Sequence, residues 1–125
     1  GYTYSGPPVA CAAGIAALDI LVREELPARV AQEAPFWEAL LHDGIAGKPH
    51  VTDVRNYGFA GAITLAPYPG EPLRRPFEVG MRLWEKGFLV RYGGDTIQLA
   101  PHFVMQREQM TSLVEALAET LDELA

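Results

Sequence analysis

The chain has 125 residues, enough for one domain with a hydrophobic core, and 49% hydrophobic with 21% charged residues is ordinary for a globular protein. The net charge of -6 argues against a nucleic-acid interface and against an anionic membrane surface, because both require clustered Lys and Arg. Cys11 is the single cysteine, so no internal disulfide forms, and no apolar run reaches the ~18 residues of a membrane span.

The first eight residues combine hydroxyl groups, glycine and proline, and they lead directly into an apolar segment that predicts a helix from Pro8 to about Leu26. The first amide groups of a helix have no partner inside it, so a hydroxyl-rich loop in front of a helix is a candidate anion site. Tyr2, Thr3 and Ser5 are the candidate donors. The alternative is a capping cluster that satisfies only the helix amides.

This first helix is apolar on nearly every face between Ala10 and Leu18, and its small residues, Gly14 among them, would allow a neighbouring backbone to approach closely. We therefore expect structure outside this chain to bury the helix. The chain also begins at Gly1 without Met, and we expect a piece of a larger protein. A single cysteine suits a reducing compartment, and we expect the protein in the cytoplasm.

Apolar residues at helical spacing predict a second helix after Pro27, with Gly44 as its stop and with Pro35 as a kink or a first turn. The character of the sequence then changes to two short β-branched segments, residues 51–57 and 60–65. We expect these segments to pair as strands around the glycine between them.

Residues 67–76 hold four prolines and a glycine and are predicted to form a surface loop. A short helix follows over residues 77–87, and then residues 88–92 and 96–99 are predicted strands, joined by a tight turn at residues 93–95. One stripe of apolar residues predicts an amphipathic terminal helix: Met110, Leu113, Val114, Leu117, Leu121 and Leu124. The predicted fold class is therefore α+β, an antiparallel sheet covered by helices and preceded by a long linking helix.

Arg91 is the sharpest candidate binding residue, because it interrupts an apolar strand directly before a Gly-Gly turn. Its planar guanidinium suits a carboxylate, which it would grip through two parallel hydrogen bonds. The alternative is an ion pair between Arg91 and Asp95 across the turn. His50 and Asp53 have a spacing found in metal sites but lack a third ligand, so we expect no metal site.

Covalent catalysis has no clear candidate in this sequence. Lys48 and Lys86 are the only lysines, and neither lies in an apolar pocket that would lower its pKa into the nucleophilic range. No paired carboxylates and no Ser-His-Asp pattern stand out either. We therefore expect no catalytic residue within this segment.

Three stretches carry a family resemblance when they are taken together. They are Gly1-Tyr2-Thr3-Tyr4-Ser5-Gly6 with Pro8 to Ala13, then Val54-Arg55-Asn56-Tyr57-Gly58, and then Gly87 to Ile97 followed by Ala100-Pro101. In order and spacing they resemble the C-terminal part of the class III aminotransferases of the ω-amino acid:pyruvate type, and within that family the β-alanine:pyruvate subgroup. Two positions depart from the family pattern: Pro7 stands where His is usual, and Thr64 stands where an acidic residue is common.

The resemblance implies an α/β parent of fold type I that binds pyridoxal 5'-phosphate (PLP) and forms a homodimer or homotetramer. Residues 1–26 would be the cofactor-phosphate loop and the linking helix from the large domain, and residues 27–125 the small C-terminal domain. Thr3 would reach across the dimer interface to the cofactor phosphate of the other subunit, with Tyr2 beside it. Arg91 would hold the substrate carboxylate and swing aside for a substrate without one.

The resemblance also implies the reaction. The parent enzyme would transfer an amino group from a β-alanine-like ω-amino acid or an amine to pyruvate, while the lysine that binds the cofactor covalently would lie upstream of this segment. The segment alone would then be inactive. The alternatives are a class III aminotransferase with a diamine or diaminopelargonate-type donor, or, for the isolated chain, a non-catalytic α+β module that binds a small acid or a protein.

Overall fold

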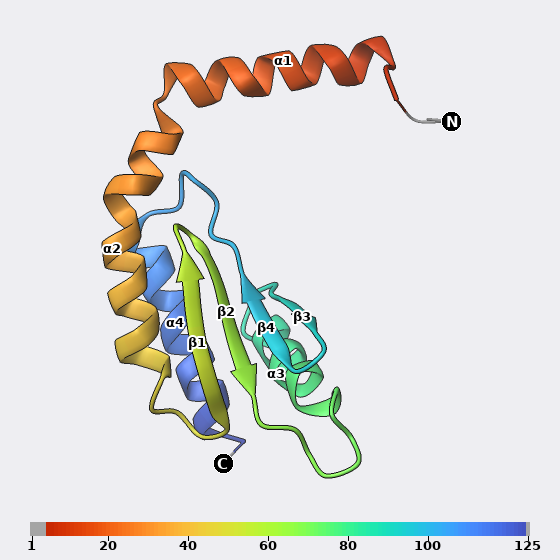
Figure 1. The fold of residues 1–125 in the computed structure, drawn as a ribbon, viewed down its shortest axis with the longest axis vertical. Helices are drawn as coiled ribbons and strands as arrows, with labels where there is room; N and C mark the ends of the chain where they lie inside the picture. Colours follow the sequence, from red (N-terminus) through yellow and green to blue (C-terminus); the bar gives the residue numbers. More distant parts are fainter. Residues whose placement is uncertain (1–4, 125) are drawn as a thin grey trace.

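The structure, a computed structural model, describes residues 5–124 (Figure 1). Two helices, a hairpin, a third helix, a second hairpin and a closing helix follow one another along the chain. This is the predicted α+β arrangement. The elements are α1 (Pro8–Arg23), α2 (Leu26–Ile45), β1 (Val51–Tyr57), β2 (Ala60–Leu65), α3 (Arg74–Glu85), β3 (Arg91–Gly93), β4 (Thr96–Leu99) and α4 (Arg107–Asp122).

The four strands form one sheet in the order β1-β2-β4-β3, and every neighbouring pair is antiparallel. Gly58 and Gly94 lie in the two hairpin turns with φ angles of 54° and 60°, a region that glycine enters without strain. The pairing of residues 51–57 with 60–65 confirms the sequence prediction. The short strand β3 lies at one edge of the sheet, and β1 lies at the other.

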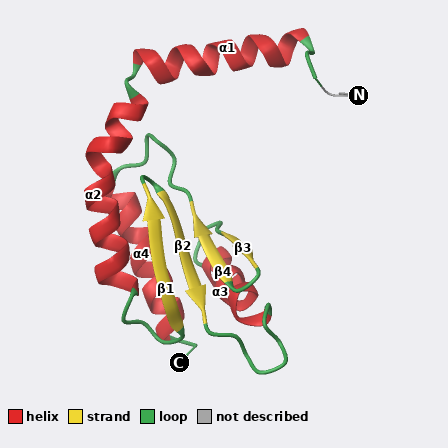
Figure 2. Cartoon of the chain, viewed as in Figure 1, coloured by secondary structure: helices red, strands yellow, loops and turns green. Residues whose placement is uncertain are grey.

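Helices α2, α3 and α4 cover one face of the sheet, as Figure 2 shows. The core lies between the sheet and these helices. Alternate residues of each strand point to this face of the sheet, and helix residues three or four positions apart point toward the same layer. Arg29 ties the loop before α4 to α2, donating to the carbonyl oxygens of Phe103 at 2.6 Å and Met105 at 2.8 Å. Fully buried core side chains include Trp37, Leu41, Ile63, Leu65, Leu83, Ile97, Met110, Leu117 and Leu121.

Helix α1 extends away from the sheet and its helices (Figure 1). None of its residues is buried, and large apolar side chains such as Val9, Ile15 and Leu18 are exposed. The helix ends at Arg23 rather than near Leu26, because Glu25 adopts a left-handed conformation with φ of 49° and α2 begins directly after it. Burial of this apolar helix by structure outside the chain stays a prediction.

Helix α2 differs from its prediction at the proposed stop. It continues through Pro35 to Ile45, and Gly44 lies inside its last turn rather than after it. The reason for a glycine there is packing: a Cβ at Gly44 would come within 2.9 Å of Cγ1 of Val114 on α4. The glycine marks a close helix–helix approach and not a helix stop.

The predicted loop over residues 67–76 is shorter than expected. Residues 74–76 form the first turn of α3, where proline is tolerated because the first amides have no partner in the helix. Arg75 and Pro76 are buried there. Arg75 donates through Nε to the carbonyl oxygen of Ala66 at 2.7 Å and stacks over the ring of Tyr68.

Strand β3 begins at Arg91 and not at residue 88, as the sequence had suggested. Helix α3 ends in a Schellman motif, in which the amide of Phe88 donates to Leu83 at 2.8 Å and that of Gly87 to Trp84 at 3.0 Å. Gly87 has the left-handed φ of 89° that this motif needs. The residues predicted to start the strand therefore complete the helix end instead.

Candidate functional site

The two predicted cofactor residues, Tyr2 and Thr3, lie outside the described residues. The structure does describe the helix start behind them. Pro7 precedes α1 in an extended conformation, and its side chain offers no capping oxygen. The amide of Cys11 makes the first helical bond, to the carbonyl oxygen of Pro7 at 3.1 Å. Because Pro8 has no N–H, the amides of residues 9 and 10 are the donors available at this end.

Arg91 is the first residue of the edge strand β3, and it is exposed. The strand register places it directly opposite Gln98 on β4, which lies opposite Ala62 on β2, which lies opposite Arg55 on β1. Residues that are directly opposed in antiparallel strands share one face of the sheet. A row of four side chains therefore crosses the whole sheet with a guanidinium at each end.

The neighbour of Arg91 on β3 fixes which face this row occupies. Tyr92 packs toward α3, with its ring centroid 5.8 Å from that of Phe77 in an edge-to-face contact. Because successive side chains of a strand point to opposite faces, Arg91 points away from α3. We call this side of the sheet the open face, and its strand residues include Asp53, Arg55, Ala62, Gln98 and Arg91.

The alternative sequence interpretation of Arg91 as an ion-pair partner of Asp95 is wrong. Asp95 lies in the hairpin turn, where its Oδ1 accepts a hydrogen bond from the hydroxyl of Thr96 at 2.8 Å. Within residues 5–124, the Arg91 side chain makes neither an ion pair nor a hydrogen bond. Its guanidinium is therefore available to a carboxylate that comes from outside this part of the chain.

Arg55, at the other end of the row, is already engaged. Its Nη1 donates to the Asp53 carboxylate and to the Thr64 hydroxyl at 2.9 Å, and the Thr64 hydroxyl lies 3.4 Å from that of Thr96. Asp53, on the same strand as Arg55, supplies the carboxylate of this pair. The ion pair between Asp53 and Arg55 was not predicted from the sequence, in which Arg55 stood out only as part of the motif at residues 54–58.

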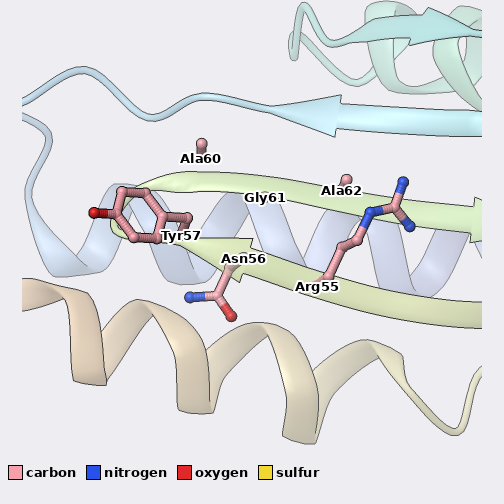
Figure 3. A pocket seen from close by; sticks show the side chains of 6 residues that line it. All are labelled: Arg55, Asn56, Tyr57, Ala60, Gly61 and Ala62. Carbon is pink, nitrogen blue, oxygen red and sulfur yellow. The ribbon is translucent and has the colours of Figure 1, made fainter.

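Figure 3 shows the pocket beside Arg55, which is lined by residues 55–57 of β1 and 60–62 of β2 and has a volume of about 260 Å³. Arg55 extends toward Ala62, whereas Asn56 points toward α2, where its Oδ1 lies 3.1 Å from His42 Nε2. Tyr57 is 91% exposed at the end of the strand. The pocket is small, and the one charged group beside it is the paired Arg55.

Two larger hollows lie on either side of Tyr92, on the side of the sheet that faces α3. One, of about 480 Å³, is lined by Leu73, Arg74, Phe77, Tyr92, Gly93 and Gly94. The other, of about 290 Å³, is lined by Gly80, Met81, Trp84, Leu89, Val90 and Tyr92. Both are mainly apolar and carry large exposed side chains next to the strand that holds Arg91.

Both lysines are engaged in surface ion pairs. Lys48 Nζ lies 2.6 Å from the carboxylate of Asp122, and Lys86 Nζ lies 2.9 Å from Glu123 and 3.3 Å from Glu119. The hydrogen bond to Glu123, with help from Glu119, raises the pKa of Lys86. A charged, paired ammonium is a poor nucleophile.

Neither a metal centre nor a membrane helix is found over residues 5–124. No group of three or more His, Cys, Asp or Glu side chains in that range is arranged to hold a metal ion. His50, one of the two residues with metal-like spacing, instead places its Nε2 3.0 Å from the carbonyl oxygen of Leu124. No helix among these residues is long and apolar enough to cross a membrane.

The fold is that of PLP-dependent transaminases. A solved structure described as the PMP-bound form of an aminotransferase from Vibrio fluvialis superposes with a TM-score of 0.84 at 28% identity, covering 99% of this chain and 28% of that one. The model of the aminotransferase class-III family matches residues 1–121, so the chain belongs to that family. The resemblance seen in the sequence is thereby confirmed.

Two curated relatives are similar over nearly the whole chain. The β-alanine–pyruvate aminotransferase of Pseudomonas aeruginosa is 53% identical over 125 residues, which are 100% of this chain and 28% of that protein. The ω-amino acid–pyruvate aminotransferase of Pseudomonas putida is 52% identical over 124 residues, 99% of this chain and 27% of that protein. The chain thus spans little more than a quarter of the length of these relatives. The family implies a PLP cofactor.

Proposed function

We propose that the enzyme containing this chain is a PLP-dependent ω-transaminase that transfers an amino group from a β-alanine-like ω-amino acid or an amine to pyruvate. The observation that carries the proposal is Arg91, a guanidinium on an edge strand of the open face with no partner in residues 5–124. Pyruvate has one carboxylate, and a planar guanidinium binds such a group through two parallel hydrogen bonds. The two pyruvate-using relatives support the choice of acceptor.

We also propose that the Arg91 side chain moves out of the substrate site when the substrate has no carboxylate there. Gly93 and Gly94 follow it closely and add no side chains beside it, so the long guanidinium stem has room to move. Arg91 would bind the carboxylate of pyruvate or of an ω-amino acid, and it would move aside for an amine that presents an apolar group. One position would thus accept two kinds of substrate.

The described residues fit the phosphate end of the cofactor. The amides of residues 9 and 10 at the start of α1 lack a side-chain cap from Pro7, and such helix starts bind anions. Thr3 and Tyr2 would add hydroxyl groups there, on the cofactor of the partner subunit in a homodimer or homotetramer. The bound cofactor would supply the carbanion-stabilising chemistry.

The remaining assignments follow from the same proposal. Residues 1–26 would belong to the cofactor-phosphate loop and linking helix, and residues 27–125 to the small domain. Lys48 and Lys86 are paired at the surface, which supports a cofactor-binding lysine elsewhere in the enzyme and an inactive isolated segment. We place the enzyme in the cytoplasm.

Arg91→Ala in the full-length enzyme tests the proposal. The KM for pyruvate should rise by about 100-fold, as expected when a charged, doubly hydrogen-bonded pair worth about 3 kcal/mol is lost. The single-turnover rate with 1-phenylethylamine, which has no carboxylate, should stay within about twofold. Arg23→Ala, which removes an exposed arginine from α1, is the matched control. Equal losses of activity with pyruvate and with the amine would contradict the role of Arg91. Activity of the wild-type enzyme with a diamine but not with β-alanine would contradict the proposed amino donor.

Thr3→Ala tests the phosphate contact. The variant should lose bound cofactor faster on dialysis, and Thr3→Ser should restore retention because it keeps the hydroxyl. Released cofactor is measured directly by its absorbance. Unchanged retention in Thr3→Ala would overturn the assignment of Thr3.

A further inference from the structure

A chain of polar contacts crosses the open face and ends at the turn between β3 and β4. Nη1 of Arg55 donates to the hydroxyl of Thr64 at 2.9 Å, and the hydroxyls of Thr64 and Thr96 lie 3.4 Å apart. The hydroxyl of Thr96 then donates to Oδ1 of Asp95 at 2.8 Å. The chain therefore connects a guanidinium on β1 with a carboxylate in the turn that follows Arg91.

The chemistry of the four groups fixes the direction of these hydrogen bonds. A guanidinium only donates, an ionised carboxylate only accepts, and a hydroxyl has a single proton to donate. Because the proton of Thr96 points to Asp95, the proton of Thr64 is the one that points to Thr96. The contact between the two hydroxyls is long, so the shorter bond to the charged acceptor contributes most to holding Asp95.

The backbone around Asp95 is held as well. The carbonyl oxygen of Asp95 accepts from the amide of Leu65 at 2.8 Å. Thr96 is a buried residue of the sheet, paired with Thr64 on one side and with Gly93 on the other. The carboxylate of Asp95 is exposed, but both its backbone and its Oδ1 are tied to the neighbouring strands.

Arg91 is the cation that Asp95 would meet if the bond from Thr96 were lost. Gly93 lies between the two on the open face and has no side chain to separate them, and the nearest group to a Cβ placed there is Nε2 of Gln98 at 3.9 Å. Arg91 precedes Gly93 by two residues, about 7 Å along a strand, which an extended arginine side chain spans. Among residues 5–124, however, the Arg91 side chain pairs with no carboxylate.

We propose that Thr96 is a positioning residue that keeps Asp95 away from Arg91. By binding the carboxylate of Asp95, its hydroxyl prevents an internal ion pair that would compete with the carboxylate of the substrate for the guanidinium. Thr64, oriented by Arg55, supports the position of that hydroxyl. This inference rests on the carboxylate-binding role of Arg91 proposed above.

Thr96→Val in the full-length enzyme tests the inference, because valine has the β-branched shape of threonine but no hydroxyl. Asp95 should then turn to Arg91. The KM for pyruvate and the dissociation constant of propionate, a carboxylate with no amino or keto group, should each rise by about three- to fivefold, as expected for competition from an exposed ion pair. The kcat at saturating pyruvate and the single-turnover rate with 1-phenylethylamine should stay within about twofold. Thr96→Ser keeps the hydroxyl and should keep the wild-type values.

Asp95→Asn distinguishes this role of Thr96 from a merely structural one, because an amide forms no ion pair with Arg91. The double variant Thr96→Val/Asp95→Asn should bring propionate binding back to within about twofold of the wild type. Thr111→Val is the control, since it removes a hydroxyl that donates to the carbonyl oxygen of Arg107 within α4 at 2.9 Å, and it should alter none of these values. If the valine variant does not fold, Thr96→Ala removes the same hydroxyl and gives the same test.

Three outcomes separate this inference from the function on which it rests. If Arg91→Ala raises the KM for pyruvate while Thr96→Val leaves propionate binding unchanged, Thr96 has no positioning role and Arg91 keeps its own. Weaker propionate binding in Thr96→Val that Asp95→Asn does not reverse would also overturn the inference. If Arg91→Ala leaves the KM for pyruvate unchanged, the proposed role of Arg91 fails first.

Discussion

The ring of Tyr92 occupies the space into which any side chain at Gly80 would project. A Cβ on Gly80 would lie 2.4 Å from Cδ1 of Tyr92 and 2.7 Å from its Cε1. Tyr92 directly follows Arg91 on β3, and Gly80 lies in the middle of α3. A glycine in the helix therefore sets how closely the strand that carries Arg91 lies against the domain.

Gly80→Ala should move Tyr92 and, with it, β3. Alanine favours a helix by up to about 1 kcal/mol over glycine, but overpacking against a ring costs about 1–3 kcal/mol, so we expect a net loss of stability. The KM for pyruvate of the full-length enzyme should rise as well, because Arg91 shifts with its neighbour. Thermal unfolding and steady-state kinetics measure the two effects. A stabilised variant with unchanged KM would show that the ring moves freely.

Gly44→Ala and Gly14→Ala form a matched pair of helix substitutions. At Gly44 a methyl group would meet Cγ1 of Val114 at 2.9 Å, whereas at Gly14 nothing lies within 4 Å. We expect Gly44→Ala to lower the free energy of unfolding of the chain by about 1–2 kcal/mol and Gly14→Ala to raise it by up to about 1 kcal/mol. Denaturant unfolding of both variants measures the difference. The same sign for both would contradict the close α2–α4 contact.

Asp53→Asn should remove the ion pair with Arg55 and lower the stability of the fold, and adding Thr64→Glu to this variant should provide a new ion pair with Arg55. The hydroxyl of Thr64 already accepts from Arg55 at 2.9 Å, so a carboxylate from that position reaches the same guanidinium across the strand pair. Exposed pairs of this kind contribute about 0.2–1 kcal/mol. The double variant should therefore recover the unfolding midpoint of the wild type. A midpoint below that of Asp53→Asn alone would show that a carboxylate at residue 64 cannot replace the one at residue 53.

Stability should fall in acid through carboxyl groups such as Glu123. Hydrogen bonds from Lys86 first, and then from Arg82, hold the pKa of Glu123 below its ordinary value. A group with a lowered folded pKa stabilises the fold above its unfolded pKa, about 4.3 for glutamate, and that contribution is lost as the pH falls through the folded pKa. Glu123→Gln should therefore flatten the loss of stability below about pH 4.3. Equal slopes for wild type and variant in chemical unfolding would contradict the ion pair.

Much of the fold was predictable because periodicity reports local structure directly. The hairpin from Val51 to Leu65 and the apolar stripe of α4 appear in the structure as the sequence indicated. The errors fell where long-range packing decided the outcome. Gly44 looked like a helix stop but faces Val114, and Phe88 looked like the start of a strand but completes the end of α3.

The site was harder to predict from the sequence than the fold was. Arg91 stood out because a charged residue interrupted an apolar run, and the structure places it on the open face. The row that links Arg91 to Arg55 gave no comparable signal, since it depends on which strands are neighbours. The order β1-β2-β4-β3 brings Arg55 and Arg91 into one row, and no local pattern encodes that order.

Arg91 lies on a strand of three exposed residues that is paired on one side only. Segments with so few neighbours open at a lower free energy than the centre of a sheet. Motion of this strand would leave the buried side chains of Trp37 on α2 and Ile63 on β2 undisturbed. The guanidinium proposed to meet different substrates therefore lies on an edge strand that can move while the buried core keeps its packing.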